Sequence, residues 1–118
     1  MKKIGLIILA LALMLAAALA GTAQADQFAT AILTVTSGAA LSIPPNAMII
    51  NGRYATQAFG TVEGGSVRLW YSGDTPTSST GHLVQAGQWF KLENANEVMN
   101  FQVIAVSATA TVTLTMSW

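Results

Sequence analysis

Apolar and polar residues alternate without interruption over residues 109–118. One set of alternate positions is hydrophobic, and the other carries mainly hydroxyl groups. Successive side chains of a β-strand point to opposite faces, so this pattern predicts a strand with one buried and one hydroxyl-covered face. Such a strand is typical of an antiparallel sheet with one side toward the core. The apolar positions are Val112, Leu114, Met116 and Trp118.

Short β-rich runs separated by turn residues occupy the chain before this segment. Residues 28–36 predict a first strand, and Asn51-Gly52 is a strong signal for a two-residue hairpin. Gly64-Gly65 marks another turn, and residues 72–81 consist of loop formers. Glu93-Asn94-Ala95-Asn96 is expected to be a polar turn followed by a single helical turn.

The spacing of these runs predicts an all-β fold. Residues 99–106 include apolar side chains at both odd and even positions, so both faces of that strand should be covered. After residue 25, no apolar period of 3.6 persists beyond one turn. About seven or eight short strands with frequent turns predict a single antiparallel β-sandwich or jelly roll over residues 26–118. The order of the strands stays open.

The first 25 residues have the pattern of an export signal. Lys2 and Lys3 precede an apolar run over residues 4–20, and Ala23-Gln24-Ala25 has the spacing that signal peptidase prefers. We therefore expect a signal helix, cleavage before Asp26, no membrane association afterwards, and a periplasmic, extracellular or cell-surface location. A retained membrane anchor is the alternative, because the run is close to the shortest that spans a bilayer.

Few charges remain once the signal segment is removed. Three basic and five acidic side chains leave a net charge of −2 over residues 26–118. Clustered Lys and Arg are missing, so we expect no nucleic-acid partner. The chain has no cysteine, so no disulfide can stabilise this small domain. Oligomerisation is another common means of stabilising small domains, and the expected main partner is therefore the protein itself.

The supply of groups for chemistry is thin. His82 is the single imidazole, and Ser78, Ser79 and Thr80 precede it in a loop that provides no third group to orient a base. Asp74 has no second carboxylate at the spacing of a calcium loop. We therefore predict no catalytic residue, no cofactor and no metal site.

Aromatic side chains leave a second interpretation open. Trp70 with Tyr71 or with Trp89 could form a platform on which a sugar ring stacks. Packing in the core or at a subunit interface is the alternative, because large aromatics contribute much of the buried area of small domains. Strand alternation prevents Trp70 and Tyr71 from being buried on one face, so one of the two must point away from the core.

A longer pattern begins at residue 67. It comprises an arginine-containing strand, Gly-x-x-Pro-Thr, Gly-His, an Ala-Gly turn, a Leu-x-Asn turn and a Phe-x-x-Ile strand. This pattern resembles small bacteriophage virion proteins of the decoration or minor capsid type, over residues 55–118. The resemblance implies a β-sandwich or jelly-roll subunit that self-associates or coats a lattice. The matching residues are Arg68, Gly73, Pro76, Thr77, Gly81, His82, Ala86, Gly87, Leu92, Asn94, Phe101 and Ile104.

The export signal departs from this resemblance, because phage capsid components assemble in the cytoplasm. The combination favours an exported cellular form that builds a surface layer, fibre or matrix. We therefore predict a non-catalytic structural subunit, with a secreted carbohydrate-binding module and a surface polysaccharide partner as the alternative. Terminal strands are often free to pair with a neighbour. The candidate assembly residues are Phe28, Ile32, Leu33, Val35, Val112, Leu114, Met116 and Trp118.

Overall fold

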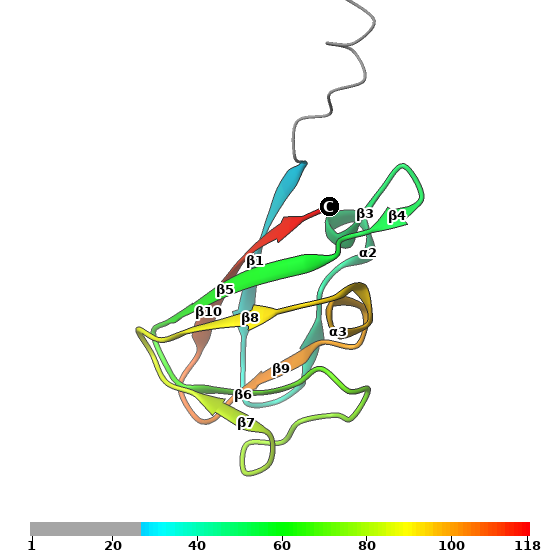
Figure 1. The fold of residues 1–118 in the computed structure, drawn as a ribbon. Helices are drawn as coiled ribbons and strands as arrows, with labels where there is room; N and C mark the ends of the chain where they lie inside the picture. Colours follow the sequence, from blue (N-terminus) through cyan, green and yellow to red (C-terminus); the bar gives the residue numbers. More distant parts are fainter. Residues whose placement is uncertain (1–26) are drawn as a thin grey trace, which may run out of the picture.

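A computed structural model describes residues 27–118 as two four-stranded antiparallel sheets packed face to face (Figure 1). The predicted signal helix over residues 1–25 lies outside the described residues. The all-β antiparallel fold is confirmed. Sheet A has the order β1 (Phe28–Val35), β10 (Ala110–Ser117), β5 (Gln57–Glu63) and β8 (Trp89–Leu92). Sheet B has the order β2 (Leu41–Ser42), β9 (Gln102–Ala105), β6 (Val67–Trp70) and β7 (His82–Val84).

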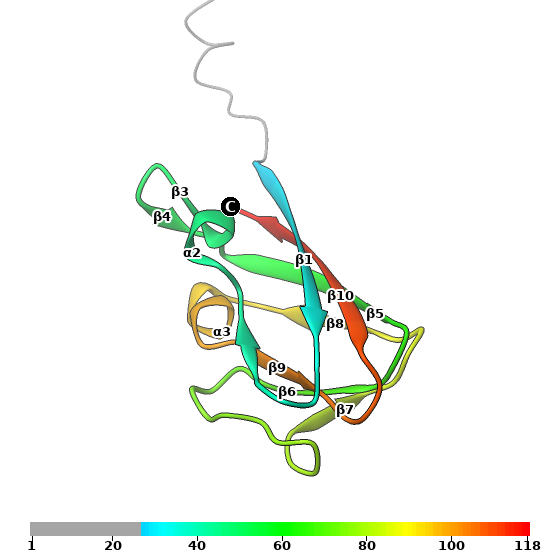
Figure 2. The ribbon, with the colours of Figure 1, turned by 180° about the vertical axis from the view of Figure 1, so that it is seen from behind.

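The strand pairs are nested within one another. The first strand, β1, pairs with the last, β10, and β2 pairs with β9. Further inward along the sequence, β5 pairs with β8 and β6 pairs with β7. This is the strand order of a jelly roll, in which one long antiparallel ribbon is folded into two sheets. Figure 2 shows β1 and β10 side by side in sheet A.

A small hairpin is inserted between β2 and β5. It consists of β3 (Ile49–Ile50) and β4 (Arg53–Tyr54), and it follows the short helix α2 (Pro45–Met48). Asn51 and Gly52 have φ values of 51° and 75°, as a two-residue turn with left-handed backbone at both positions requires. The hairpin predicted at Asn51-Gly52 is therefore confirmed.

A second short helix, α3 (Ala95–Met99), follows the predicted polar turn. The Oδ1 atom of Asn94 accepts a hydrogen bond of 3.0 Å from the backbone N–H of Glu97. The Oε2 atom of Glu97 accepts one of 2.9 Å from the backbone N–H of Glu93, the residue before the N-cap. The first bond satisfies a donor in the first turn of the helix, and the second ties the preceding turn to it. Residues 27–118 contain no helix with the length and hydropathy of a membrane span.

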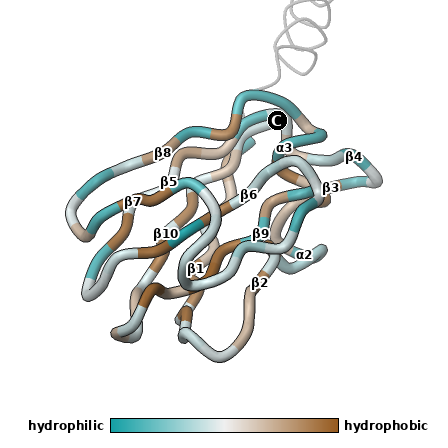
Figure 3. The backbone as a smooth tube through the Cα atoms, turned by 90° about the horizontal axis from the view of Figure 1, so that it is seen from below, coloured by the Kyte–Doolittle hydropathy of each residue, from teal (hydrophilic) through white to brown (hydrophobic). Residues whose placement is uncertain are grey.

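The core lies between the two sheets. The inward side chains of β10, Val112, Leu114 and Met116, have no solvent exposure. Figure 3 shows the resulting alternation of apolar and polar positions along the strands. At one end of the core, the ring of Phe90 lies over Gly60 and stacks on Phe101, with ring centroids 5.5 Å apart. Burial of such apolar area supplies most of the driving force for folding.

Candidate interaction surfaces

The outward side chains of sheet A form a surface that we call the outer A face. Strand pairing arranges it in rows that cross the whole sheet. One row contains Ile32, Thr113, Thr61 and Trp89, and the next contains Thr30, Thr115, Phe59 and Lys91. Because β-strands alternate their side chains, this surface is the hydroxyl-rich counterpart of the buried apolar face.

Four large hydrophobic side chains stand on the outer A face. Phe28, Ile32, Phe59 and Trp89 are 65%, 67%, 46% and 64% exposed. The rings of Phe59 and Trp89 stack on each other, with centroids 5.6 Å apart and an interplanar angle of 29°. The exposed apolar groups therefore form two sets, Phe28 and Ile32 on β1 and the Phe59–Trp89 pair across the sheet, with hydroxyl and amide side chains between them.

Charge is sparse on this face. Within the four strands of sheet A, the charged side chains are those of Glu63 and Lys91, and both are exposed. The two lie in different rows, Glu63 opposite Thr111 and Lys91 opposite Phe59. A second molecule that approaches the centre of the face therefore meets hydroxyl and apolar groups.

The assembly role predicted for the last strand needs correction. β10 lies between β1 and β5 and is paired along both edges, so its backbone is not free to pair with a neighbour. Its apolar residues Val112, Leu114 and Met116 are buried in the core. Trp118 is half-buried, and its indole N–H donates a 2.8 Å hydrogen bond to the carbonyl of Arg53.

The first strand behaves differently. β1 is at an edge of sheet A and has one paired side. Of its four candidate residues, Phe28 and Ile32 point outward, whereas Leu33 and Val35 are buried against sheet B. The predicted strand is thus placed where a neighbour can reach it, but only half of the named side chains are on the accessible face.

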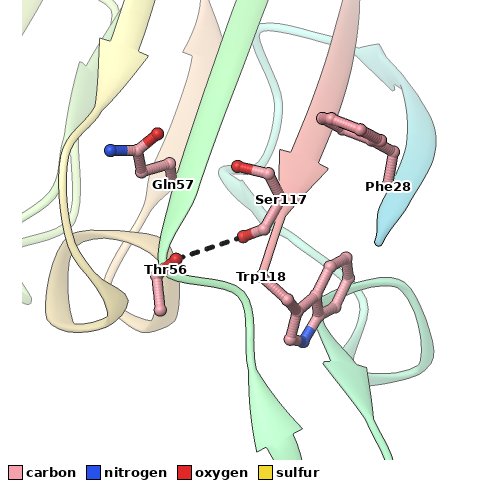
Figure 4. A pocket seen from close by; sticks show the side chains of 5 residues that line it. All are labelled: Phe28, Thr56, Gln57, Ser117 and Trp118. Carbon is pink, nitrogen blue, oxygen red and sulfur yellow. Dashed lines mark hydrogen bonds between the residues drawn. The ribbon is translucent and has the colours of Figure 1, made fainter. Parts of the chain in front are cut away.

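A hollow of about 370 Å³ continues the outer A face at its end (Figure 4). Phe28, Ser117 and Gln57 lie in one row across β1, β10 and β5, with Thr56 and Trp118 beside them. The Thr56 hydroxyl donates a 3.4 Å hydrogen bond to the carbonyl of Ser117. The hollow is lined by hydroxyl, amide and aromatic groups, and it offers a polar recess next to the exposed Phe28 ring.

A second aromatic cluster lies on sheet B. The ring of His82 meets Trp70 edge-on, with centroids 4.9 Å apart, and stacks on Tyr71 at 5.4 Å with an interplanar angle of 13°. Trp70 is half-buried and Tyr71 is exposed. Trp89 belongs to the other sheet, so the predicted platform of Trp70 with Trp89 is wrong. Trp70 does lie beside Tyr71.

The loop before His82 is held by its own groups. Arg68 donates from Nε to the carbonyl of Ser78 at 3.2 Å and from Nη1 to the carbonyl of Gly81 at 3.0 Å. The Thr77 and Thr80 hydroxyls hydrogen-bond to each other at 2.6 Å. The position of these groups therefore indicates a structural role for Arg68, which fixes the loop over sheet B.

Titratable groups do not gather in the part of the chain that the structure describes. Within residues 27–118, no three side chains of the types that ligate metals lie close enough together to hold an ion. The Asp74 carboxylate accepts a 3.1 Å hydrogen bond from the hydroxyl of Ser72 in the same loop. The ring of His82 contacts the rings of Trp70 and Tyr71.

Sequence reasoning missed Phe59 as a surface residue. Its signal was present, since Ala58 and Gly60 on either side are small and inward-facing, which places Phe59 outward. Comparison of the chain with protein-family models, curated proteins and solved structures finds no match.

Proposed function

We propose that this protein is an exported, non-catalytic structural subunit that self-associates into a surface layer, fibre or virion-like lattice. The observation that carries the proposal is the outer A face, with Phe28, Ile32, Phe59 and Trp89 exposed among hydroxyl groups. Full burial of an exposed side chain of this size contributes about 1.5–3 kcal/mol, and these partly exposed side chains would contribute a corresponding part of it. A partner that covers these exposed apolar side chains therefore stabilises the assembly of the two molecules.

The fold is compatible with this role. Jelly rolls build viral capsid proteins and also lectin domains. The absence of cysteine supports assembly as a further source of stability, because a small domain without disulfides has a limited core. The low charge of the outer A face supports a second copy as its partner, since two identical faces would not repel each other.

The Ile32→Thr variant tests this proposal. We expect residues 26–118 to form oligomers whose mass rises with concentration in light scattering, and the variant to dissociate at about tenfold higher concentration because apolar burial is lost. Leu83→Thr is the matched control, since Leu83 is 47% exposed but lies on sheet B. A strictly monomeric wild-type protein at high concentration would contradict the proposal.

A carbohydrate-binding module is the second candidate function, and the exposed Trp89 ring beside Phe59 favours it. Flat aromatic rings can lie against the apolar face of a sugar. On this reading, the tryptophan fluorescence of the wild-type protein shifts when a polysaccharide is added, and Trp89→Ala abolishes the shift without unfolding the protein. Trp118→Phe should keep the shift. Unchanged fluorescence across a panel of polysaccharides would exclude this function.

A further inference from the structure

The four sheet edges differ in how they are protected. Natural proteins guard exposed edges with short strands, lysine, proline or bulges, because an open edge can pair with another chain. β2 has two residues and β7 has three, and β8 has four and carries Lys91. β1 has eight residues, none of which is charged, proline or glycine. Three edges thus follow the protective rule through short length or a lysine. β1 has neither of these, and the neighbouring element that contacts it is the four-residue helix α2.

The direction of the free backbone groups on β1 follows from its pairing with β10. The backbone N–H of Trp118 donates to the carbonyl of Gln27 at 3.3 Å. Hydrogen-bonded and non-hydrogen-bonded pairs alternate in an antiparallel ladder, so the odd-numbered residues of β1 bond to β10. The even-numbered residues therefore direct their N–H and C=O groups to the open edge. These residues are Phe28, Thr30, Ile32 and Thr34, whose side chains also point outward.

This edge is complementary to itself. Two antiparallel copies of β1 keep their buried faces on the same side of the sheet only if even-numbered residues lie opposite even-numbered residues. With Ala31 on a two-fold axis, Thr30 faces Ile32 of the second copy and Phe28 faces Thr34. All four outward residues are then in hydrogen-bonded pairs, which gives about eight backbone hydrogen bonds. No like charges meet, because the strand has none.

We propose that β1 of one molecule pairs antiparallel with β1 of a second copy, with Ala31 on the two-fold axis, and joins two A sheets into one continuous sheet. The helix α2 is the neighbour of β1 within the same molecule. It directs Met48 into the core, between the two sheets. The outer A faces of both copies then form one larger surface. The inference rests on the proposed self-association and specifies the surface and symmetry of one contact.

Disulfide cross-linking tests this arrangement, because the natural chain has no cysteine that would interfere. Hydrogen-bonded antiparallel partners have Cα atoms about 5.5 Å apart, within the range that a disulfide spans. Mild oxidation of mixed Thr30→Cys and Ile32→Cys proteins should give a covalent dimer that contains one chain of each. A mixture of the Thr113→Cys and Ile32→Cys proteins is the control. Thr113 lies on the central strand β10, so this mixture should give no such dimer. The inference would be overturned if the Thr113→Cys mixture gave a dimer and the Thr30→Cys mixture gave none.

The Thr30→Pro variant provides a second readout. The N–H of Thr30 points to the open edge, so proline should remove an intermolecular donor and leave the ladder with β10 intact. We expect a folded protein by circular dichroism that no longer forms the β1 contact, with a loss of at least tenfold in dimer affinity. Thr115→Lys, which alters the outer A face but not the edge, should keep this dimer.

The outcomes separate this inference from the proposed function. If Thr30→Pro assembles as the wild type does and Thr115→Lys does not, the protein self-associates through its face and the edge inference is wrong. If both variants and the wild type are monomeric, the proposed function is wrong, and the inference fails with it. The inference would also be overturned if the Ile32→Cys protein formed disulfides with an unrelated added protein and none with the Thr30→Cys protein.

Discussion

Replacement of Gly60 by alanine is expected to lower the free energy of unfolding by about 1–3 kcal/mol, the usual cost of overpacking a core. A Cβ atom on Gly60 would overlap the Cε and Cζ atoms of the Phe90 ring. That ring cannot easily move away, because its other side stacks on Phe101, which has no solvent exposure. The added methyl group must therefore displace two rings or bend β5.

Urea denaturation of the monomeric protein measures this effect. Gly38→Ala is the matched control, because its backbone is not left-handed and the nearest atom to a new Cβ is the Thr36 hydroxyl at 3.8 Å. We expect that control to change stability by less than about 0.5 kcal/mol, as for other surface substitutions. Combining Gly60→Ala with Phe90→Leu should cost less than the sum of the two single changes. A Gly60→Ala protein as stable as the wild type would refute the overlap.

The Phe101→Ala variant should lose about 3–5 kcal/mol, the largest effect that we expect from one side chain. Phe101 is completely buried, and its removal leaves a cavity beside Phe90. Domains of this size are stable by about 5–15 kcal/mol in total, and this one has no disulfide to limit the loss. Much of the protein should therefore be unfolded in moderate urea.

Phe28→Ala provides the comparison for Phe101→Ala. Both variants remove a phenyl ring, but the ring of Phe28 is 65% exposed. Its loss should shift the urea midpoint by little when the protein is dilute enough to be monomeric. Equal shifts for the two variants would contradict the complete burial of Phe101 in the core.

Local pattern was sufficient to predict the elements. The strand predicted from the alternation over residues 109–118 corresponds to β10, and the predicted Asn51-Gly52 turn joins β3 to β4. These features depend on neighbours in sequence, which fix the direction of side chains and the backbone angles of turns. The apolar residues of 99–106 also predicted the covered strand β9, in which Val103 and Ile104 are both buried.

Strand order could not be predicted in this way, and the errors in the candidate site follow from that. The terminal position of β10 in the sequence predicts a free strand, but pairing with β1 and β5 places β10 inside sheet A. The sequence offers Trp70 and Trp89 as one aromatic platform, yet the two residues lie on different sheets. Which strand is an edge depends on contacts between distant segments, and alternation carries no information on them.

The nested pairing of strands also determines when the molecule can fold. β1 has its partner in sheet A only after residues 110–117 have been synthesised, and β2 must wait for β9 in the same way. Such a topology has a high contact order, which slows folding to milliseconds or seconds. During synthesis and export, the early strands therefore remain unpaired until nearly the whole domain is available. We expect the unfolded chain to need a chaperone before the last strand pairs, to avoid aggregation.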